Sequence, residues 1–501
     1  MTSMRAELVT RSPQRMTADA GRVVLHLFVP GQEGFEHQES RAGVVLSRIL
    51  ALSDDDVRAT LHDVLTRFEG RHRDLKGTFR RHAGELADRL DPRREFTESR
   101  MLLLGAMFTN EYAIEGAALC NPSMVAHPDQ SDVETGCLRF VMSVRGIGEG
   151  HRSTIGFRTG VIDAAGGAAI DEPAPFASIG RVEHALLTGA VFRAELDSQG
   201  LAGEAADYVF GALGELFTRS DLDERLDSLA AHLRTRAHAE ETIATIRGIA
   251  ARSYAVEFGS KVSLSERVLW PAMEAEQGGV EDARFVRFVD DDGSVTYHAT
   301  YTAYSGSQIS QQLLTTTDFQ TFTSTPLVGR AAANKGLALF PRRIDGRYAA
   351  MSRSDRETNS VAIADHLSVW PIASPCQQPI EAWETLQLGN CGPPIETEAG
   401  WLVLTHGVGP MRTYSIGAIL LDLDDPTRMI GRLRRPLLKP APDEQNGYVP
   451  NVVYSCGGLV HADTLVIPYG ICDGAIGVAS IALPALLEEL VDDATDVPRE
   501  R

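Results

Sequence analysis

The stretch Gly278-Gly-Val-Glu-Asp-Ala-Arg-Phe285, followed by Val295-Thr-Tyr-His-Ala-Thr-Tyr-Thr-Ala-Tyr-Ser-Gly306, decides the fold of this chain. Both runs hold apolar, β-branched and aromatic residues, and Asp290-Asp-Asp-Gly293 between them supplies turn residues with a glycine that tolerates positive φ. The pattern predicts a β-hairpin with an acid at its head. Because neighbouring side chains on a strand point to opposite faces, we expect one of Glu281 and Asp282 to face inward.

The hairpin lies in a long region of similar character, from about residue 101 to residue 487. Short apolar runs are separated there by Gly, Pro, Asn and Asp, which is typical of an all-β sandwich, barrel or propeller. Residues 201–258 interrupt this rhythm with apolar positions at helical spacing, and we expect a helical insertion there. The runs otherwise recur every roughly 40 to 60 residues, which is the length of a propeller blade.

The two ends of the chain differ from this β region. Residues 1–20 are polar and lack periodicity, so we expect a disordered start, and residues 488–501 are expected to form a C-terminal tail. Residues 21–100 are expected to form a helical N-terminal extension after one strand that begins at Val23. Ser53, followed by three aspartates, is the expected N-cap of one helix, and a second is expected from Leu75 to Leu90.

Composition excludes several classes of protein. The chain has 501 residues, 43% of them hydrophobic, which is ample for a large core. Its formal charge of −20 argues against nucleic acid as a partner. No apolar run has the roughly 18 to 20 residues of a membrane span, so we expect a cytoplasmic protein with no membrane partner. The six cysteines form no Cys-x-x-Cys pair, and neither a metal site nor a disulfide framework is expected.

Ordered motifs over roughly residues 110 to 485 resemble glycoside hydrolase family 130, the mannoside phosphorylases and mannosidases. The matching elements are Asn121-Pro-Ser123, Glu281-Asp-x-Arg284, Asn334-Lys-Gly336 with Leu339-Phe-Pro341, Gly392-Pro-Pro-Ile395 with Gly400-Trp-Leu402 and His406-Gly407, Gly447-Tyr-Val-Pro-Asn451, and Tyr469-Gly-Ile-Cys-Asp473. The chain is similar to a divergent, long member of that family with extra helical segments. The resemblance implies a mainly β fold, namely a five-bladed β-propeller with an N-terminal helical extension and a helical insertion.

The resemblance also implies the site. Asp282 would be the general acid, acting through a sugar hydroxyl with inversion at the anomeric carbon. The residues that would bind substrate are Arg145, Glu281, Lys335, Arg353, His406 and Asp473. Structural alternatives stay open for several of them. Glu281 and Asp282 could cap a turn and pair with Arg284, Arg145 could form a structural ion pair, His406 could be a core histidine, and Asp473 could cap a turn.

The nucleophile distinguishes two activities, phosphate in phosphorylases and water in hydrolases. Lys335 and His406 match the family's phosphate-binding cluster, but Gln308-Ile-Ser-Gln-Gln312 lacks the cation that relatives carry there, and Gln387 replaces a lysine. The sequence therefore favours an inverting hydrolase of mannose-containing oligo- or polysaccharides. The residues considered for the water-activating base, by residue type alone, are Asp355, Glu357 and Glu396.

Two other functions stay open, and so does the state of assembly. One function is a phosphorylase that releases mannose 1-phosphate, for which inorganic phosphate would be needed; no other cofactor is expected. The other is a non-catalytic protein, either a carbohydrate-binding propeller or a scaffold whose helical parts carry the function. The retention of Asp282 argues against a binding module. The helical segments could also support a homo-oligomer.

Overall fold

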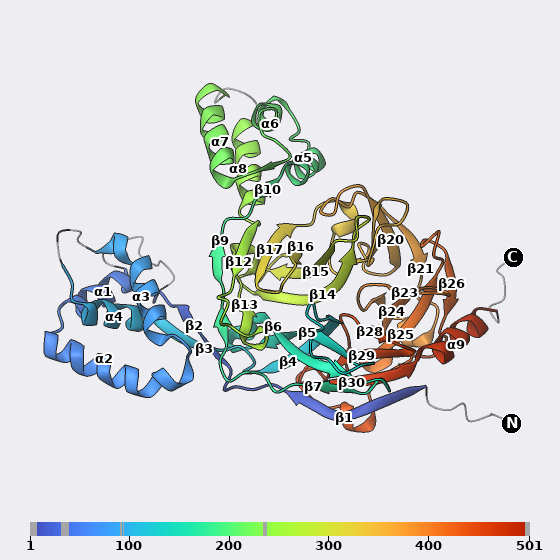
Figure 1. The fold of residues 1–501 in the computed structure, drawn as a ribbon. Coiled ribbons are helices and arrows are strands. Elements are labelled where there is room, and N and C mark those ends of the chain that lie inside the picture. The colour runs from blue at the N-terminus through green and yellow to red at the C-terminus, as the bar shows by residue number, and fades with distance from the viewer. Residues whose placement is uncertain (1–7, 32–39, 91–92, 94, 234–237, 496–501) are drawn as a thin grey trace. The chain divides into compact units, whose positions relative to one another are not determined.

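The computed structural model describes residues 8–31, 40–90, 93, 95–233 and 238–495 (Figure 1). The chain divides into two compact units. The β unit comprises Met1–Ala18, Ala117–Pro173 and Gly180–Arg501, and the helical unit comprises Asp19–Gly116 and Ala174–Ile179. The described part of the chain holds no helix long and apolar enough to cross a membrane.

In its described residues, the helical unit contains one two-stranded sheet and four α-helices. Its elements are β2 (Val23–Leu27), α1 (Arg41–Leu50), α2 (Asp54–Phe68), α3 (Leu75–Glu85), α4 (Glu98–Met107) and β3 (Thr109–Ala113), and β2 pairs with β3. Ser53 caps α2 as expected, since its side chain accepts a hydrogen bond from the Asp56 amide. Gly105 lets α3 and α4 approach closely, because a Cβ there would lie 1.9 Å from the Phe79 carbonyl oxygen.

This unit extends further along the chain than expected. We expected strands from about residue 101, but α4 continues to Met107, and the helical unit reaches Gly116. The apolar run 102–104 explains the misreading, because a short apolar run fits a buried helix as well as a buried strand.

Among the described residues, and apart from the small sheet of the helical insertion, the strands of the β unit form five antiparallel sets. The first three are β4 (Ala118–Ala126), β5 (Leu138–Ile147), β6 (Ser153–Ile162), β7 (Ala168–Ile170) and β13 (Arg267–Leu269); β14 (Gly279–Val289), β15 (Val295–Tyr304), β16 (Ile309–Thr316), β17 (Thr321–Pro326), β12 (Tyr254–Glu257) and β9 (Arg181–Glu183); and β18 (Ala338–Leu339), β19 (Tyr348–Ser352), β20 (Asn359–Ala364) and β21 (Ala373–Gln377). A parallel pairing of Gly279 with Ser153 joins the first two.

The other two sets complete the β unit. They are β22 (Gln387–Asn390), β23 (Ile395–Thr397), β24 (Gly400–Val408), β25 (Tyr414–Leu421) and β26 (Met429–Arg432); and β27 (Val453–Tyr454), β28 (Leu459–His461), β29 (Thr464–Ile471), β30 (Ala475–Ala482) and β1 (Val9–Thr17). The protein is therefore mainly β, as expected. Helix α9 (Leu483–Thr495) follows β30 and covers most of the expected C-terminal tail, while residues 496–501 lie outside the described residues.

Strand β1 corrects the expectation of a disordered start. Val9–Thr17 pairs antiparallel with β30, from Val9 opposite Ile481 to Thr17 opposite Ala475. The partner lies more than 450 residues away in sequence, so no local pattern in this polar segment indicates the pairing. Residues 1–7 of the expected disordered segment lie outside the described residues.

The helical insertion occupies residues 187–250 instead of 201–258. It contains a small sheet of β10 (Leu187–Thr188) and β11 (Leu216–Phe217), with α5 (Gly189–Ser198), α6 (Glu204–Phe210), α7 (Arg219–Leu233) and α8 (Ala239–Ala250). The end of the expected range, Tyr254–Glu257, is instead strand β12, which pairs with β17 and β9.

Candidate active site

The predicted hairpin is formed by β14 and β15, but a β-bulge changes the direction of its acids. Glu281 pairs with Thr302 and Arg284 with Thr300, so β14 carries one residue more than β15 across this interval. Asp282 lies in the bulge with a φ of 57°, in the left-handed region. Glu281 and Asp282 therefore do not follow the alternation expected for neighbours on a regular strand. Both lie next to Arg145, whose guanidinium is 2.6 Å from Glu281 Oε1 and 3.7 Å from Asp282 Oδ1.

Two more polar residues reach the site from left-handed backbone. Asn121 has a φ of 49° in an irregularity of β4, and Asp473 has a φ of 51° just after β29. The Asn121 side-chain amide donates a hydrogen bond to Asp282 Oδ1. Such conformations are strained for residues other than glycine and concentrate at functional sites. Three different strand sets thus each contribute one polar residue in this conformation.

Glu281 bridges two cations. Its Oε1 accepts from Arg145 Nη2 at 2.6 Å, and its Oε2 accepts from Lys335 Nζ at 2.6 Å. All three side chains are half-buried or buried, so these charge-assisted bonds fix Arg145 and Lys335 in position. Both oxygens of Glu281 are engaged, and its geometry is that of a positioning residue.

Asp282 is a buried carboxylate among cations. Burial alone would raise its pKa, but Arg284, Arg145 and Lys335 together with the Asn121 amide hold the pKa below its ordinary value. Asp282 is therefore ionised at neutral pH. Arg284 lies 4.0 Å from Asp282 Oδ2 and donates at 2.9 Å to the Tyr454 hydroxyl.

Arg353 and His406 form a second layer of the site. Arg353 Nη1 donates to His406 Nε2 at 3.1 Å. Burial, Arg353 and Arg284 place the pKa of His406 well below its ordinary value, so the ring is neutral and its proton is assigned to Nδ1. Within the described ranges, no carboxylate lies in ion-pair distance of Arg353, and its buried Nε has no hydrogen-bond partner. A largely buried cation without an acid favours the binding of an anion.

Gly389 makes room for this layer. A Cβ at this position would lie 2.5 Å from His406 Cε1 and 2.8 Å from Arg353 Nη1. The pairing of β22 with β24 sets Gly389 directly opposite His406. Any larger residue would displace the Arg353 guanidinium or the imidazole.

Asp473 is the second carboxyl group of the site. Burial and the charge of Asp282 raise its pKa from 3.8 to about 6, against the opposing effect of Arg145. Asp473 is therefore protonated at mildly acidic pH while Asp282 is ionised. The two carboxyl groups differ in protonation because their surroundings differ.

The raised pKa of Asp473 has a measurable effect on stability. Between pH 4 and 6 the folded protein binds a proton that the unfolded chain has lost, so the free energy of unfolding falls as pH rises through this window. We expect Asp473→Asn to remove this pH-dependent contribution to the free energy of unfolding. When the pH is raised from 4.5 to 8, the free energy of unfolding of the variant should therefore rise by about 2 kcal/mol relative to that of the native chain. Urea unfolding at both pH values measures the difference, and an equal effect of the substitution at both would contradict the assignment.

These residues converge on one cavity of about 320 Å³ in the β unit. Six of the seven predicted site residues line it, and Glu281 lies directly behind Arg145 and Lys335. The lining residues are Asn121, Arg145, Asp282, Arg284, Lys335, Arg353, Gln387, His406, Arg412, Tyr414, Val449, Val452, Tyr454 and Asp473. The structure thus brings together residues that lie more than 300 positions apart in the sequence.

Sequence reasoning missed several members of this lining, among them two tyrosines, an asparagine and an arginine. Asn121 stands in the Asn-Pro-Ser element used for the resemblance, but nothing in its local pattern indicates a contact with Asp282. Tyr414 stacks on His406 and Tyr454 meets it edge-on, with ring centroids 6.2 and 5.0 Å apart. Arg412 is exposed at the cavity and has a φ of 56°. These four come from a strand irregularity, from strand ends and from a turn, where hydrophobic periodicity carries no signal.

The three residues considered as a water-activating base do not line the cavity. Glu396 pairs with Arg342 at 2.7 Å, and Asp355 accepts hydrogen bonds from Glu357 and Thr358 in an exposed turn. The carboxylates on the described lining are Asp282 and Asp473. Ser310, where the sequence lacks the expected cation, lies at a different pocket.

Comparison with known proteins identifies the family. The sequence profile of glycoside hydrolase family 130, described as beta-1,4-mannooligosaccharide phosphorylase, matches residues 238–492. The chain belongs to glycoside hydrolase family 130. The family-130 match includes the bulge at Asp282 and all later strand sets, while β4–β6 and the helical unit precede it.

Relatives with curated names are phosphorylases. The 1,2-beta-oligomannan phosphorylase of Thermoanaerobacter sp. (strain X514) is 35% identical over 226 residues, covering 44% of this chain and 74% of the relative. The beta-1,2-mannobiose phosphorylase of Listeria innocua is 32% identical over 249 residues, covering 47% and 67%. A solved structure of the Listeria innocua beta-1,2-mannobiose phosphorylase matches with a TM-score of 0.45 and 21% identity, covering 76% of this chain and 93% of the other. This family-130 chain is thus similar to enzymes named for phosphorolysis of mannosides.

Proposed function

We propose that this protein is a mannoside phosphorylase that cleaves β-mannosides with inorganic phosphate and releases mannose 1-phosphate. The single observation that carries the proposal is Arg353, a half-buried cation on the cavity lining with no carboxylate partner among the described residues, near Arg284. The loss of cations at Ser310 and Gln387 led the sequence analysis to favour a hydrolase. An anion site built from other arginines supports the phosphorylase instead.

The charge of the cavity supports an anionic second substrate. Its lining carries five cations, Arg145, Arg284, Lys335, Arg353 and Arg412, against two carboxyl groups, in a chain whose formal charge is −20. Glu281 behind the lining neutralises part of this excess. A phosphate dianion needs several charge-assisted donors to replace its hydration shell, and such a cluster provides them.

The chemistry assigned to the acid follows from its surroundings. In the proposed reaction a phosphate oxygen attacks the anomeric carbon, the bond to the glycosidic oxygen breaks, and that oxygen receives the proton of Asp282, directly or through a sugar hydroxyl. Asp282 is ionised among these cations, so it must gain a proton before it can act. A phosphate dianion beside Arg284 offsets the cation that lowers its pKa most, and therefore favours protonation.

Hydrolysis would need a different constellation. An inverting hydrolase requires a carboxylate that activates water on the face opposite the acid. Asp473 is the one further carboxyl group on the described lining, and burial together with the charge of Asp282 raises its pKa to about 6. It interacts with the same Arg145 that lies beside Asp282. Phosphate needs no base, because it enters the reaction already ionised.

The architecture proposed for this chemistry is a five-bladed β-propeller. The five antiparallel sets of the β unit agree in number with the blades expected from the resemblance, and β1 with β27–β30 joins the two ends of the β unit in one set. Site residues come from β4, β5, β14, β24 and the end of β29, as expected when inner strands converge on a central channel. Asp282 and the substrate-binding residues Arg145, Glu281, Lys335, Arg353, His406 and Asp473 keep their proposed roles, with Arg353 reassigned to phosphate.

Phosphate dependence tests the proposal. We expect cleavage of β-1,2- or β-1,4-mannobiose to rise with phosphate concentration to saturation and to fall to background in a phosphate-free buffer. Initial rates of mannose-unit release, with sulfate at equal ionic strength as the control, measure this. A rate that does not change with phosphate, with free mannose as the product, would support the hydrolase.

A further inference from the structure

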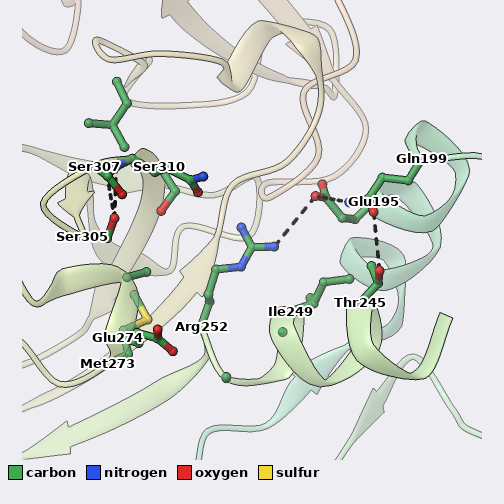
Figure 2. Close-up of a pocket in the computed structure, with 15 residues that line it drawn as sticks. Glu195, Gln199, Thr245, Ile249, Arg252, Met273, Glu274, Ser305, Ser307 and Ser310 are labelled. Atoms are coloured by element: carbon green, nitrogen blue, oxygen red, sulfur yellow. Dashed lines mark hydrogen bonds and ion pairs between the residues drawn. The ribbon is translucent and has the colours of Figure 1, made fainter. Parts of the chain in front are cut away.

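A second pocket lies where the helical insertion meets the turn between β15 and β16. It has a volume of about 620 Å³ and is called the outer pocket here. Figure 2 shows Glu195 on α5, Gln199 at the C-terminal end of α5, Thr245 on α8, and Ser305 and Ser307 on the turn around it. The volume is in the range of small-molecule sites. Without the helical insertion one wall of this pocket would be missing.

The outer pocket lies at the same end of the β14–β15 hairpin as the catalytic acid. Gly279 pairs with Tyr304 and Glu281 with Thr302, and the turn that lines the outer pocket begins at Ser305. The acidic head of β14 and this turn are therefore neighbours along one edge of the sheet.

A smaller hollow adjoins the outer pocket. It has a volume of about 290 Å³ and shares Met273 and Glu274 with the outer pocket. Its lining continues to Arg152 and Gln277, where Arg152 Nε donates to the Gln277 carbonyl oxygen at 3.1 Å. The residue before Arg152, His151, contacts the Tyr448 hydroxyl, and Val449 lines the catalytic cavity. A series of contacts and chain neighbours thus leads from this hollow, through His151 and Tyr448, to Val449 at the catalytic cavity.

Aromatic rings border this series. Tyr448 is 42% exposed, and the Trp270 ring lies beneath the Arg152 guanidinium at 5.5 Å. An exposed aromatic ring offers an apolar face with a polar edge, which suits the alternating apolar and hydroxyl-bearing surfaces of a sugar ring.

The lining of the outer pocket suits a neutral ligand rich in hydroxyl groups. Serine and threonine hydroxyls and glutamine amides both donate and accept hydrogen bonds, as sugar hydroxyls do. The charged side chains partly neutralise each other, since Arg252 lies 4.0 Å from Glu195, which also accepts from Gln199 at 3.0 Å. The pocket therefore lacks the cation excess that marks the catalytic cavity.

We propose that the outer pocket binds the remote mannosyl residues of a long mannooligosaccharide whose terminal unit occupies the catalytic cavity. This inference rests on the proposed function and names the substrate class as oligomannosides longer than a disaccharide. Binding energy gained at remote units of a substrate raises kcat/KM for the long chain and leaves the short one unaffected.

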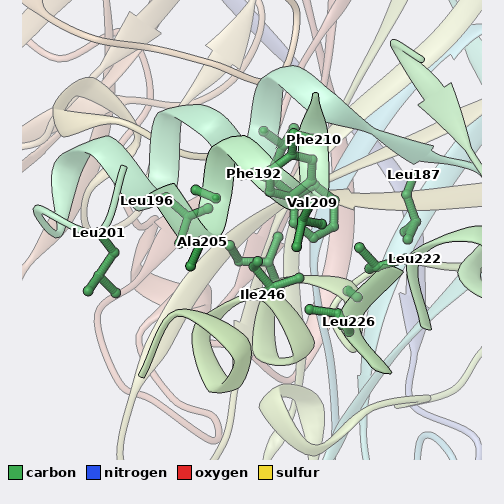
Figure 3. Packing of buried hydrophobic residues seen from close by; sticks show 14 of the residues in the cluster. Leu187, Phe192, Leu196, Leu201, Ala205, Val209, Phe210, Leu222, Leu226 and Ile246 are labelled. Atoms are coloured by element: carbon green, nitrogen blue, oxygen red, sulfur yellow. The ribbon is translucent and has the colours of Figure 1, made fainter. Parts of the chain in front are cut away.

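The helical insertion has a buried apolar core, which holds its wall of the outer pocket in place. Its buried core joins α5, α6, α7 and α8, with Phe192, Leu196, Val209 and Ile246 at its centre (Figure 3). Val328 from the β unit belongs to the same cluster. The wall of the outer pocket thus packs, through this cluster, against Val328 just after β17.

Gly248 allows the pocket to be blocked without disturbing this core. It lies in α8 on the lining of the outer pocket, is exposed, and a Cβ there would meet no atom within 4 Å. Gly248→Trp places a large ring in the pocket, and Gly248→Ala adds one methyl group to the same helix. Gly84→Trp is the matched control, since Gly84 is an exposed glycine of α3 with equally open space.

Initial rates with mannobiose and with mannohexaose test the inference. For Gly248→Trp we expect kcat/KM for mannohexaose to fall about tenfold or more while that for mannobiose stays within twofold. Gly248→Ala and Gly84→Trp should match the native chain on both. An equal effect on both substrates, or no effect on either, would overturn the inference.

Calorimetric titration separates this inference from the proposed function. Binding of mannohexaose to the full chain without phosphate requires no turnover, and Gly248→Trp should weaken it about tenfold relative to mannobiose. If no substrate is cleaved but this difference persists, the phosphorylase proposal fails and the outer pocket stands. If cleavage is phosphate-dependent but mannohexaose binds both proteins equally, the outer pocket fails alone.

Discussion

Asp282→Asn is expected to lower kcat for mannobiose cleavage by roughly 10²- to 10⁴-fold, the usual contribution of a positioned general acid. Asparagine keeps the shape of the side chain and an oxygen that accepts from the Asn121 amide. It cannot donate a proton of the required acidity. Because sugar binding depends on the surrounding residues, KM for mannobiose should change little.

The same substitution should leave phosphate binding intact or strengthen it. Asp282 is the acid closest to Arg284, at 4.0 Å, and its removal frees that cation for an anion. Steady-state kinetics in both substrates and calorimetric titration with mannobiose measure the two effects. Asp291→Asn, an identical change at an exposed turn residue of the same hairpin, is the control. A kcat within tenfold of the native value would place the acid elsewhere, and Asp473 would then be the next residue to test.

Arg353→Met is expected to raise KM for phosphate by roughly 10- to 100-fold, with little change in KM for mannobiose. The estimate corresponds to the loss of one or more hydrogen bonds to a charged group, at about 1.5 to 3 kcal/mol. Methionine fills a similar buried volume beside His406 and Gly389 without a charge. The change therefore removes the cation while keeping the packing.

Two further variants make this result specific. Arg353→Lys keeps the charge but not the forked donors, and should fall between methionine and the native residue. Arg330→Met removes an exposed arginine that does not line the cavity and should change neither constant. A rise in KM for mannobiose alone would return Arg353 to the sugar-binding role that the sequence analysis gave it.

The sequence predicted the β class and the position of the decisive hairpin because both rest on local alternation. The run from Val295 to Tyr304 is strand β15 as expected. The bulge at Asp282 could not be predicted, since Glu-Asp-x-Arg fits a regular strand equally well, and the extra residue becomes visible only through its register with Thr300 and Thr302. The direction of Glu281 depended on that bulge.

The features that the sequence did not predict depend on contacts between residues far apart in the chain. The polar segment that forms β1 is ordered by β30, and the contacts of Asn121 and Tyr454 with Asp282 and Arg284 join different strand sets. At Ser310 and Gln387 the chain lacks cations that the family carries, and this comparison of single positions favoured a hydrolase. Arg353 was placed among the substrate-binding residues, but the sequence could not reveal that Arg353 lacks a carboxylate partner among the described residues and lies near Arg284 in the same cavity.

The product formed at the anomeric carbon tests most directly the claim that phosphate is the nucleophile. Mannobiose incubated with the native chain and inorganic phosphate can be followed by phosphorus and proton NMR, which identify the product and its anomeric configuration. Our account predicts α-mannose 1-phosphate formed in equal amount to the mannose released, because phosphate attacks a β-mannoside with inversion. Mannose as the only product, with the phosphate signal unchanged, would contradict it.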